Sequence, residues 1–390
     1  MFSSDQHAST DSAVQAQARS EVEPKSAGGP ANDRSPPEPR RRRTPLDSAS
    51  APIWIATGVL FLLSWVLEPS SVRHSALLGM LPFAAVLAIA AMGQTLVIQQ
   101  GGIDLSVPGM MSATVVIVTR YPSGDSGKLA VALLLALAIT VGAGVLSGVL
   151  VSWVGVTPIV ATLGMNALLY GAVLDISGGT PRTTTSELFK FASGKLAGIP
   201  NTVIIAVILT AAVAFVIKRT VVGRRFEAAG AGLFAARAAG LEARRYQFAA
   251  YVTAAALYWT AGVLLAGVVS TPSVFQGDSY LLPSVAAVVL GGTSLLGGRG
   301  SVIASAVAAL FITQLDQFVL VTGAKQGVQN LVDAAALAAG IAIYSVPWRR
   351  LFEALRRSRD DRNGGVRESA DVDRVTHVER GAELAPRPYE

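Results

Sequence analysis

The segment "AAVLAIAAMGQTLVIQQGGIDLSVPGMMSATVVIVT", residues 84–119, decides the fold class, because two uncharged apolar runs flank a short polar turn. The turn, "QQGGIDLSVPG" at 99–109, holds the only carboxylate of the segment, Asp104, together with glycines and a proline. Crossing the hydrocarbon core takes about 20 mainly apolar helical residues. The segment therefore predicts two membrane-crossing helices that meet at an irregular turn, with a carboxylate at or inside the membrane edge.

The chain as a whole has the composition of a polytopic membrane protein. Of its 390 residues, 51% are hydrophobic and 15% are charged, with a mean hydropathy of +0.49, whereas soluble domains carry about 25% charged residues. The absence of cysteine excludes disulfides, thiolate metal sites and a cysteine nucleophile. The histidines, His7, His74 and His377, are too scattered to predict a metal site. The net charge of +6 comes largely from basic residues beside apolar runs, which favours anionic lipid over nucleic acid.

Ten apolar segments predict an all-α polytopic membrane protein with about ten transmembrane helices. They cover residues 52–67, 77–98, 104–121, 129–151, 158–177, 201–217, 247–269, 281–296, 302–320 and 328–347. The first, third and eighth are short, and such segments in transporters often form broken helices at binding sites. We expect a membrane domain at 51–347 between polar tails at 1–50 and 348–390, whose composition predicts disorder.

The distribution of Lys and Arg predicts that both termini lie in the cytoplasm. Arg40–Arg43 precede the first apolar segment, and basic residues are retained on the cytoplasmic side of membrane helices. An even number of spans places the 218–246 link inside, and this link has seven basic residues against two acidic ones. The 178–200 link, predicted outside, has only three basic residues. Ten spans therefore agree with the charge rule.

The turn at 101–112, "GGIDLSVPGMMS", has two compatible interpretations. Asp104 and Ser106 are good helix N-cap residues, and Pro108 is tolerated in a first helical turn, so the turn can simply start the third span. Alternatively, the irregular backbone lines a translocation path, where it is tolerated at membrane depth. The neutral amides of Gln94, Gln99 and Gln100 would suit a polyol there.

A second glycine-rich motif, "LLPSVAAVVLGGTSLLGGRGS" at 281–301, also has two interpretations. Its glycine pairs flank Thr293 and Ser294 and are typical of close helix packing in membranes. The alternative is a second broken helix that faces the path. Three further acidic residues, Asp175, Asp316 and Asp333, lie in or near spans, and we expect interfacial or packing roles for them.

The 221–248 stretch, "VVGRRFEAAGAGLFAARAAGLEARRYQF", is alanine-rich and helix-prone and has an apolar face of Leu233, Phe234 and Leu241. A simple tether needs no such face, so the stretch predicts a docking surface for a soluble partner. The sequence has no G-x-x-x-x-G-K-[ST] phosphate loop and no H-E-x-x-H motif. It therefore predicts a transport role without catalytic or metal-binding residues.

Four stretches together resemble the permease subunits of ribose- and xylose-type bacterial ABC sugar importers, within the branched-chain amino acid and monosaccharide permease superfamily. They are "GQTLVIQQGGIDLSV" (93–107), "TPIVATLGMNALLYGAVLDISGGTP" (157–181), "EAAGAGLFAARAAGL" (227–241) and "AAVVLGGTSLLGGRGS" (286–301). The resemblance covers about residues 52–347. It departs from the family pattern at Pro108, at the Ala229–Gly232 stretch and at Leu281–Pro283.

The resemblance implies a permease subunit in the bacterial inner membrane that moves a monosaccharide. It implies three kinds of partner: a cytoplasmic ATPase that uses the ATP, an extracytoplasmic sugar-binding protein, and a second permease chain, identical or related. No cofactor is expected on this chain. The 218–246 segment would contain the coupling helix. The candidate coupling residues are Arg225, Glu227, Gly230, Ala236, Arg237 and Gly240.

The candidate substrate-pathway residues are Gln94, Gly101, Gly102, Asp104, Ser106, Asn166, Thr293 and Ser294. Three alternatives stay open from the sequence. One is an importer for a non-sugar solute, such as a nucleoside or a branched-chain amino acid. Another is a proton-coupled secondary transporter, for which Asp104 is the best-placed carboxylate. The third is a membrane scaffold that recruits a soluble partner without transporting a solute.

Overall fold

A computed structural model describes residues 51–345, so both predicted tails lie outside the described residues. The first half contains α2 (Ala51–Leu67), η2 (Pro69–Val72), α3 (His74–Gln99), α4 (Val107–Arg120), η3 (Ser126–Lys128), α5 (Leu129–Val149), η4 (Leu150–Val154) and α6 (Pro158–Ser177). The middle contains α7 (Ser186–Ser193), β1 (Lys195–Leu196), β2 (Ile199–Pro200), α8 (Asn201–Arg219), α9 (Val221–Ala231) and α10 (Leu233–Ala238). The last part contains α11 (Ala243–Val269), η5 (Gln276–Tyr280), α12 (Leu281–Leu290), α13 (Val302–Val321) and α14 (Gln326–Ser345).

The all-α polytopic fold is confirmed, while the number of crossings is not. Each apolar segment contains a helix, but six helical stretches within 51–345 are long and apolar enough to cross a membrane. These are α3, the η3–α5–η4 stretch, α6, α8, α11 and α13. Helices α2 and α4 are shorter, and α12 has ten residues, about half of what a crossing needs. The expectation that the third and eighth segments are short helices is confirmed.

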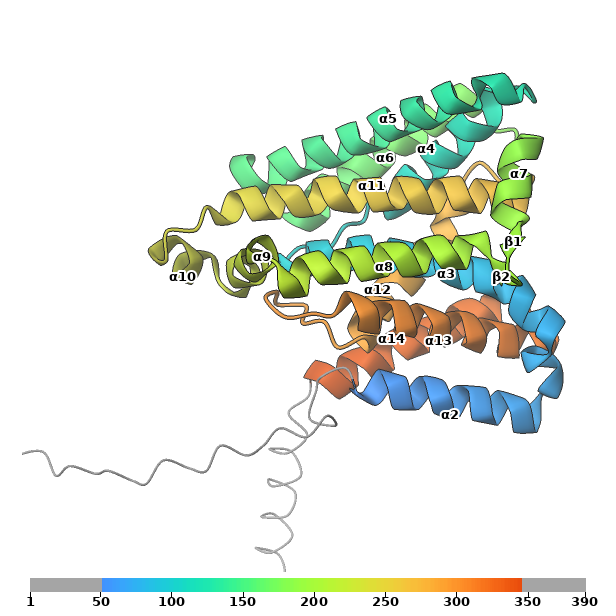
Figure 1. Cartoon of the computed structure of the whole chain (residues 1–390). Helices are drawn as coiled ribbons and strands as arrows, with labels where there is room; N and C mark the ends of the chain where they lie inside the picture. Colours follow the sequence, from blue (N-terminus) through green and yellow to red (C-terminus); the bar gives the residue numbers. More distant parts are fainter. Residues whose placement is uncertain (1–50, 346–390) are drawn as a thin grey trace, which may run out of the picture. The chain divides into compact units, whose positions relative to one another are not determined.

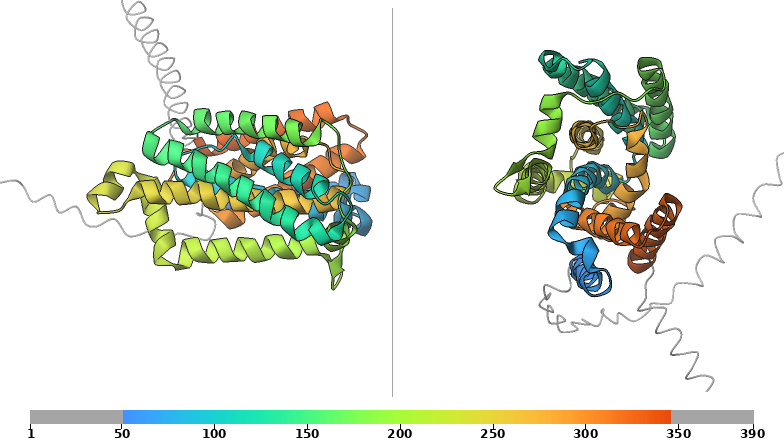
Figure 2. Two further views of the ribbon diagram at one scale, coloured as in Figure 1. Left: turned by 90° about the horizontal axis from the view of Figure 1, so that it is seen from above. Right: turned by 90° about the vertical axis from the view of Figure 1, so that its right-hand side faces the viewer.

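Helices α3 and α11 form the centre of the described bundle. Every residue of α3 from 84 to 99 is buried, as expected of a helix that is apolar all round. Helix α3 packs against α8, α11, α12 and α13, and α11 also packs against α4, α5 and α7. The end-on view in Figure 2 shows α11 with its axis toward the viewer and other helices around it. The turn at 99–109 thus begins at the most buried of the six candidate membrane helices.

The two long links lie at opposite ends of α8, as the sequence predicted. The 178–200 link contains α7 and a two-residue antiparallel hairpin, β1 with β2, none of which the sequence predicted. The 218–246 link contains two helices, α9 and α10, where one short helix was expected. Figure 1 shows α9 and α10 at one end of the bundle and α7 at the other. We call the end at α9–α10, which contains the predicted coupling segment, the coupling end, and the end at α7 the opposite end.

Small residues allow close helix contacts in the centre. A Cβ atom added to Gly144 on α5 would lie 2.5 Å from the Cβ of Ala255 and 2.9 Å from the carbonyl oxygen of Tyr251, both on α11. Such close backbone approach is typical of helix pairs in membranes. A Cβ atom on Gly142, two residues earlier on α5, would meet nothing within 4 Å.

These two glycines form a matched test of the α5–α11 contact. We expect Gly144→Val to lower the free energy of unfolding by about 1–3 kcal/mol, because an overpacked interior costs about this much. Gly142→Val should keep wild-type stability, since valine is at least as favourable as glycine in a helix. Thermal unfolding of the purified protein in detergent measures both. Equal losses of stability in the two variants would contradict a tight contact between Gly144 and α11.

Candidate functional site

The turn between α3 and α4 is partly buried: Gly102, Asp104 and Ser106 are buried, whereas Gly101 is exposed. Gly101 has a φ of +77°, a left-handed conformation that favours glycine. A Cβ atom on Gly102 would lie 2.6 Å from the hydroxyl oxygen of Tyr251 on α11. Irregular backbone is tolerated at membrane depth only where protein or water surrounds it. The two glycines are therefore required by the turn and its packing on α11.

Asp104 holds the turn that precedes α4. Its Oδ1 accepts hydrogen bonds from the backbone N–H of Ser106, at 2.9 Å, and from the Ser106 hydroxyl. Its Oδ2 has no hydrogen-bond partner within residues 51–345. The N-cap residue of α4 is Ser106, and its side chain makes no capping hydrogen bond. Asp104 thus closes a turn ahead of the helix, and neither predicted residue caps α4 through its side chain.

Two backbone N–H groups at the start of α4 and just before it donate to side chains of α6. Asn166 Oδ1 accepts the N–H of Gly109 at 2.8 Å, and the Thr162 hydroxyl accepts the N–H of Leu105 at 3.0 Å. The two side chains are four residues apart and therefore lie on the same face of α6. Asn166, a predicted pathway residue, thus fixes the position of α4 against α6.

Gln94 joins α3 to α11. Its Oε1 accepts a hydrogen bond from the Tyr258 hydroxyl at 3.0 Å, and both side chains are fully buried. The Nε2 of Gln94 and the hydroxyl of Tyr251 have no hydrogen-bond partner in the described part of the chain. Together with Asp104 Oδ2, these atoms form a set of buried polar groups beside the turn.

Three segments meet at a contact that we name the glycine junction, made by Gln99, Gln100, Gly230, Gly297 and Gly298. The N–H of Gly298 donates to the carbonyl oxygen of Gln99 at 2.9 Å. The side chain of Gln100 donates to the carbonyl oxygen of Phe226 at 2.9 Å. A Cβ atom on Gly230 would lie 1.9 Å from the Gln99 oxygen. The end of α3, helix α9 and the 291–301 loop are therefore in direct backbone contact.

Thr293 and Ser294 belong to the 291–301 loop at this junction. Thr293 is buried, and a Cβ atom on Gly300 would lie 2.8 Å from its methyl carbon and 2.6 Å from Gln99 Nε2. The N–H of Ser294 donates to the carbonyl oxygen of Arg299 at 2.9 Å, which closes the loop on itself. Thr293 and Gln99 thus approach the same residue, Gly300, while Ser294 is bonded within the loop.

Of the predicted coupling residues, Ala236 is buried, Glu227 and Gly230 are half-buried, and Arg225, Arg237 and Gly240 are exposed. Glu227 forms an ion pair with Lys218, Ala236 is buried against Ala229 and Ala243, and Gly240 ends α10 with a φ of +74°. The side chains exposed at this end include Arg225, Arg237, Phe234 and Leu296. Phe234 is 88% exposed and Leu296 is 93% exposed, so the coupling end presents two large apolar side chains to its surroundings.

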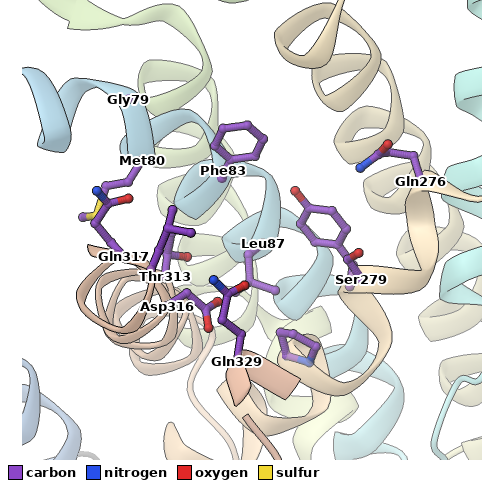
Figure 3. A pocket seen from close by; sticks show the side chains of 13 residues that line it. Gly79, Met80, Phe83, Leu87, Gln276, Ser279, Thr313, Asp316, Gln317 and Gln329 are labelled. Carbon is purple, nitrogen blue, oxygen red and sulfur yellow. The ribbon is translucent and has the colours of Figure 1, made fainter. Parts of the chain in front are cut away.

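A cavity of about 440 Å³ lies at the opposite end of the bundle (Figure 3). It is formed by the first half of α3, by η5 and the start of α12, by the end of α13 and by α14. Its polar side chains are Gln276, Ser279, Thr313, Asp316, Gln317 and Gln329, with Tyr280 beside them. None of the predicted pathway residues lines it. The polar run "TQLDQ" at 313–317 is the sequence feature that could have predicted this polar lining. From the sequence we instead predict a packing or interfacial role for Asp316.

Comparison with known proteins identifies the family. The family model described as "Branched-chain amino acid transport system / permease component" matches residues 76–342. The ribose import permease protein RbsC of Escherichia coli K12 is 31% identical over 294 residues, which cover 74% of this chain and 91% of that protein. The galactofuranose transporter permease protein YtfT of the same strain is 33% identical, covering 71% and 81%. The fructose import permease protein FruF of Bifidobacterium longum is 33% identical, covering 63% and 71%. No solved structure matches the chain.

The role of Asp104 in the turn can be tested by two substitutions. We expect Asp104→Ala to lower the free energy of unfolding by about 1–3 kcal/mol, because it leaves buried donors of Ser106 unpaired. Asp104→Asn should be milder, since its Oδ1 can still accept the Ser106 N–H. Thermal unfolding and the fraction of monodisperse protein in detergent measure both effects. If the asparagine variant loses as much stability as the alanine variant, the turn hydrogen bonds alone do not stabilise the protein and the negative charge of Asp104 is required.

Proposed function

Because the chain belongs to the permease family of branched-chain amino acid transport systems, we propose that it is the membrane-spanning subunit of an ABC importer for a monosaccharide. It is a multi-pass inner-membrane protein and a transport component rather than an enzyme. The relatives named as ribose, galactofuranose and fructose permeases support the sugar assignment. The structural observation that carries the proposal is the glycine junction, because it connects a surface segment directly to the central helix α3.

The coupling end is suited to receive a soluble ATPase. Phe234 on α10 and Leu296 in the 291–301 loop are almost fully exposed, and large apolar side chains often serve as anchors in protein interfaces. Arg225 and Arg237 lie on the same two-helix segment and supply positive charge around them. In this proposal, α9 and α10 enter a groove of the ATPase, and ATP is bound by that subunit, since the sequence here has no phosphate loop.

The glycine junction gives the motion of the ATPase a route into the bundle. A displacement of α9 pushes Gly230 against the Gln99 carbonyl, because no side chain separates the two backbones. The 291–301 loop moves with them through the Gly298–Gln99 hydrogen bond. The transport cycle is alternating access, and nucleotide and binding protein drive it by binding inward- and outward-open states with different affinities.

The proposal includes ten crossings, with both termini and the α9–α10 link in the cytoplasm. The partners are a cytoplasmic ATPase, an extracytoplasmic sugar-binding protein and a second permease chain. The chain itself binds no cofactor. A proton-coupled transporter would instead need Asp104 to exchange protons, and the proton would be carried by Oδ2, which has no partner within residues 51–345, because Oδ1 accepts two hydrogen bonds from Ser106. Uptake that stays ATP-dependent and proton-independent in Asp104→Asn favours the importer, whereas proton-driven uptake by the wild type favours the alternative.

Phe234 tests the docking surface. We expect Phe234→Glu to reduce copurification of the ATPase subunit and sugar-stimulated ATP hydrolysis by about tenfold or more, because anchor residues contribute about 2 kcal/mol or more to interfaces. The matched control is Phe191→Glu, which changes a half-exposed phenylalanine of α7 at the opposite end. The control should copurify the ATPase normally. Normal coupling in the Phe234 variant would rule out docking through α10.

The orientation is testable because the natural chain has no cysteine. A single cysteine at Lys195 in β1 should react with a membrane-impermeant maleimide added to spheroplasts. A single cysteine at Ala238 in α10 should react only after the membrane is permeabilised. Both positions are exposed, so access alone decides the outcome. The reverse labelling pattern would contradict a cytoplasmic α9–α10 link.

A further inference from the structure

The cavity at the end opposite to the coupling end has the size of a small-molecule site. Its volume of about 440 Å³ falls within the range of about 300–1,000 Å³ that such sites occupy. Phe83 and Leu87 of α3 and Pro283 of α12 supply apolar surface. Sites of this kind are mainly apolar, and a few polar groups fix the orientation of the ligand.

The polar groups of the cavity come from three separate elements. Gln276 and Ser279 lie on η5, Asp316 and Gln317 on α13, and Gln329 on α14. Figure 3 shows Thr313, Asp316 and Gln329 near one another, with Gln276 on another wall. Each glutamine amide offers both donors and an acceptor, and the carboxylate offers acceptors. The walls can therefore bind several hydroxyl groups of one solute from different sides.

A second carboxyl group, which is not part of the cavity lining, lies beside Asp316. Asp316 and Asp333 of α14 lie within hydrogen-bonding distance of each other. Asp333 is only 7% exposed, and one oxygen of each carboxyl group has no hydrogen-bond partner within residues 51–345. Buried acceptors without donors are costly, so the unpaired oxygen of Asp316, the carboxyl group that lines the cavity, favours a ligand that brings hydrogen-bond donors.

The charge of the lining selects against anions. No Lys or Arg is among the described residues that line the cavity, and its one ionisable carboxyl group is Asp316. A solute with a carboxylate or a phosphate would meet like charge and find no cation to pair with it. A neutral polyhydroxylated solute brings hydroxyl donors and no charge.

From these observations we propose that the cavity between α3, η5, α13 and α14 is the site where this chain binds the sugar, with Asp316 as a hydrogen-bond acceptor for its hydroxyl groups. The assignment of a sugar rests on the proposed function. Helix α12 connects this site to the coupling end, since Pro283 lines the cavity and the loop after α12 reaches the glycine junction. Occupation of the cavity and movement of α9 therefore act on the same ten-residue helix.

Cysteine protection tests the site in the assembled transporter. A single cysteine is placed at Gln317 in the naturally cysteine-free chain and is modified with N-ethylmaleimide, with and without D-ribose, D-galactose or D-fructose. We expect the sugar that the transporter imports to slow modification about tenfold at about nine times its dissociation constant, where the site is occupied about 90% of the time. L-leucine should give no protection. The matched control is a cysteine at Thr322, which follows α13, is exposed and does not line the cavity.

Uptake kinetics test the acceptor role of Asp316. In proteoliposomes with the ATPase and the binding protein, Asp316→Asn should raise the KM for the sugar about tenfold, as expected when a hydrogen bond to a charged group is weakened. ATPase copurification should stay normal. The control Asp175→Asn changes an exposed carboxylate of α6 outside the cavity and should leave KM unchanged.

The possible outcomes separate the site from the function. If the wild type imports one of the sugars, but that sugar neither protects Gln317→Cys nor binds less well to Asp316→Asn, the site is wrong and the importer stands. If leucine or Na⁺ protects the cysteine and the sugars do not, the solute class is wrong. If a sugar protects the cysteine while the wild type shows no ATP-dependent uptake, the importer is wrong and the site stands.

Discussion

The carbonyl oxygen of Gln99 is the point on which the arrangement of the bundle depends. It ends the most buried of the six candidate membrane helices, accepts the N–H of Gly298 and leaves room only for a glycine at position 230. Inside a membrane protein, backbone groups at a helix end must find partners in the protein, because lipid offers none. Here the partners come from a surface helix and a distant loop, so folding of the centre and placement of the coupling end are one event.

This constraint explains why glycines occur in pairs at sites that otherwise look unrelated. The pairs at 101–102 and 297–298 lie on two sides of the same contact, and both include left-handed residues. Any side chain on Gly298 would meet Ala231 of α9 at 2.5 Å. The backbone-to-backbone contact is therefore stiff, and stiffness is what a coupling element needs, because packed interiors transmit displacement with little loss.

The sequence predicted the helices well and the cavity not at all, for a physical reason. Apolar runs report local burial in lipid or protein, so α3, α6, α8 and α13 begin and end within a few residues of their predicted bounds. The side chains that line the cavity come from α3, η5, α13 and α14, and no local pattern relates them. Asp104 and Thr293 attracted attention because they interrupt apolar runs, yet such interruptions mark turns as readily as they mark sites.

The positions of the cavity and the glycine junction limit how this chain can work. They lie at opposite ends of the bundle, so a solute in the cavity cannot touch α9, and only shared helices can relate the two. Helix α3 contributes its first half to the cavity and its last residue to the junction. Helix α12 begins at the cavity and continues into the 291–301 loop. Because α12 is held by η5 at one side and by the junction at the other, our proposal assigns the coupling motion to α3 and α12.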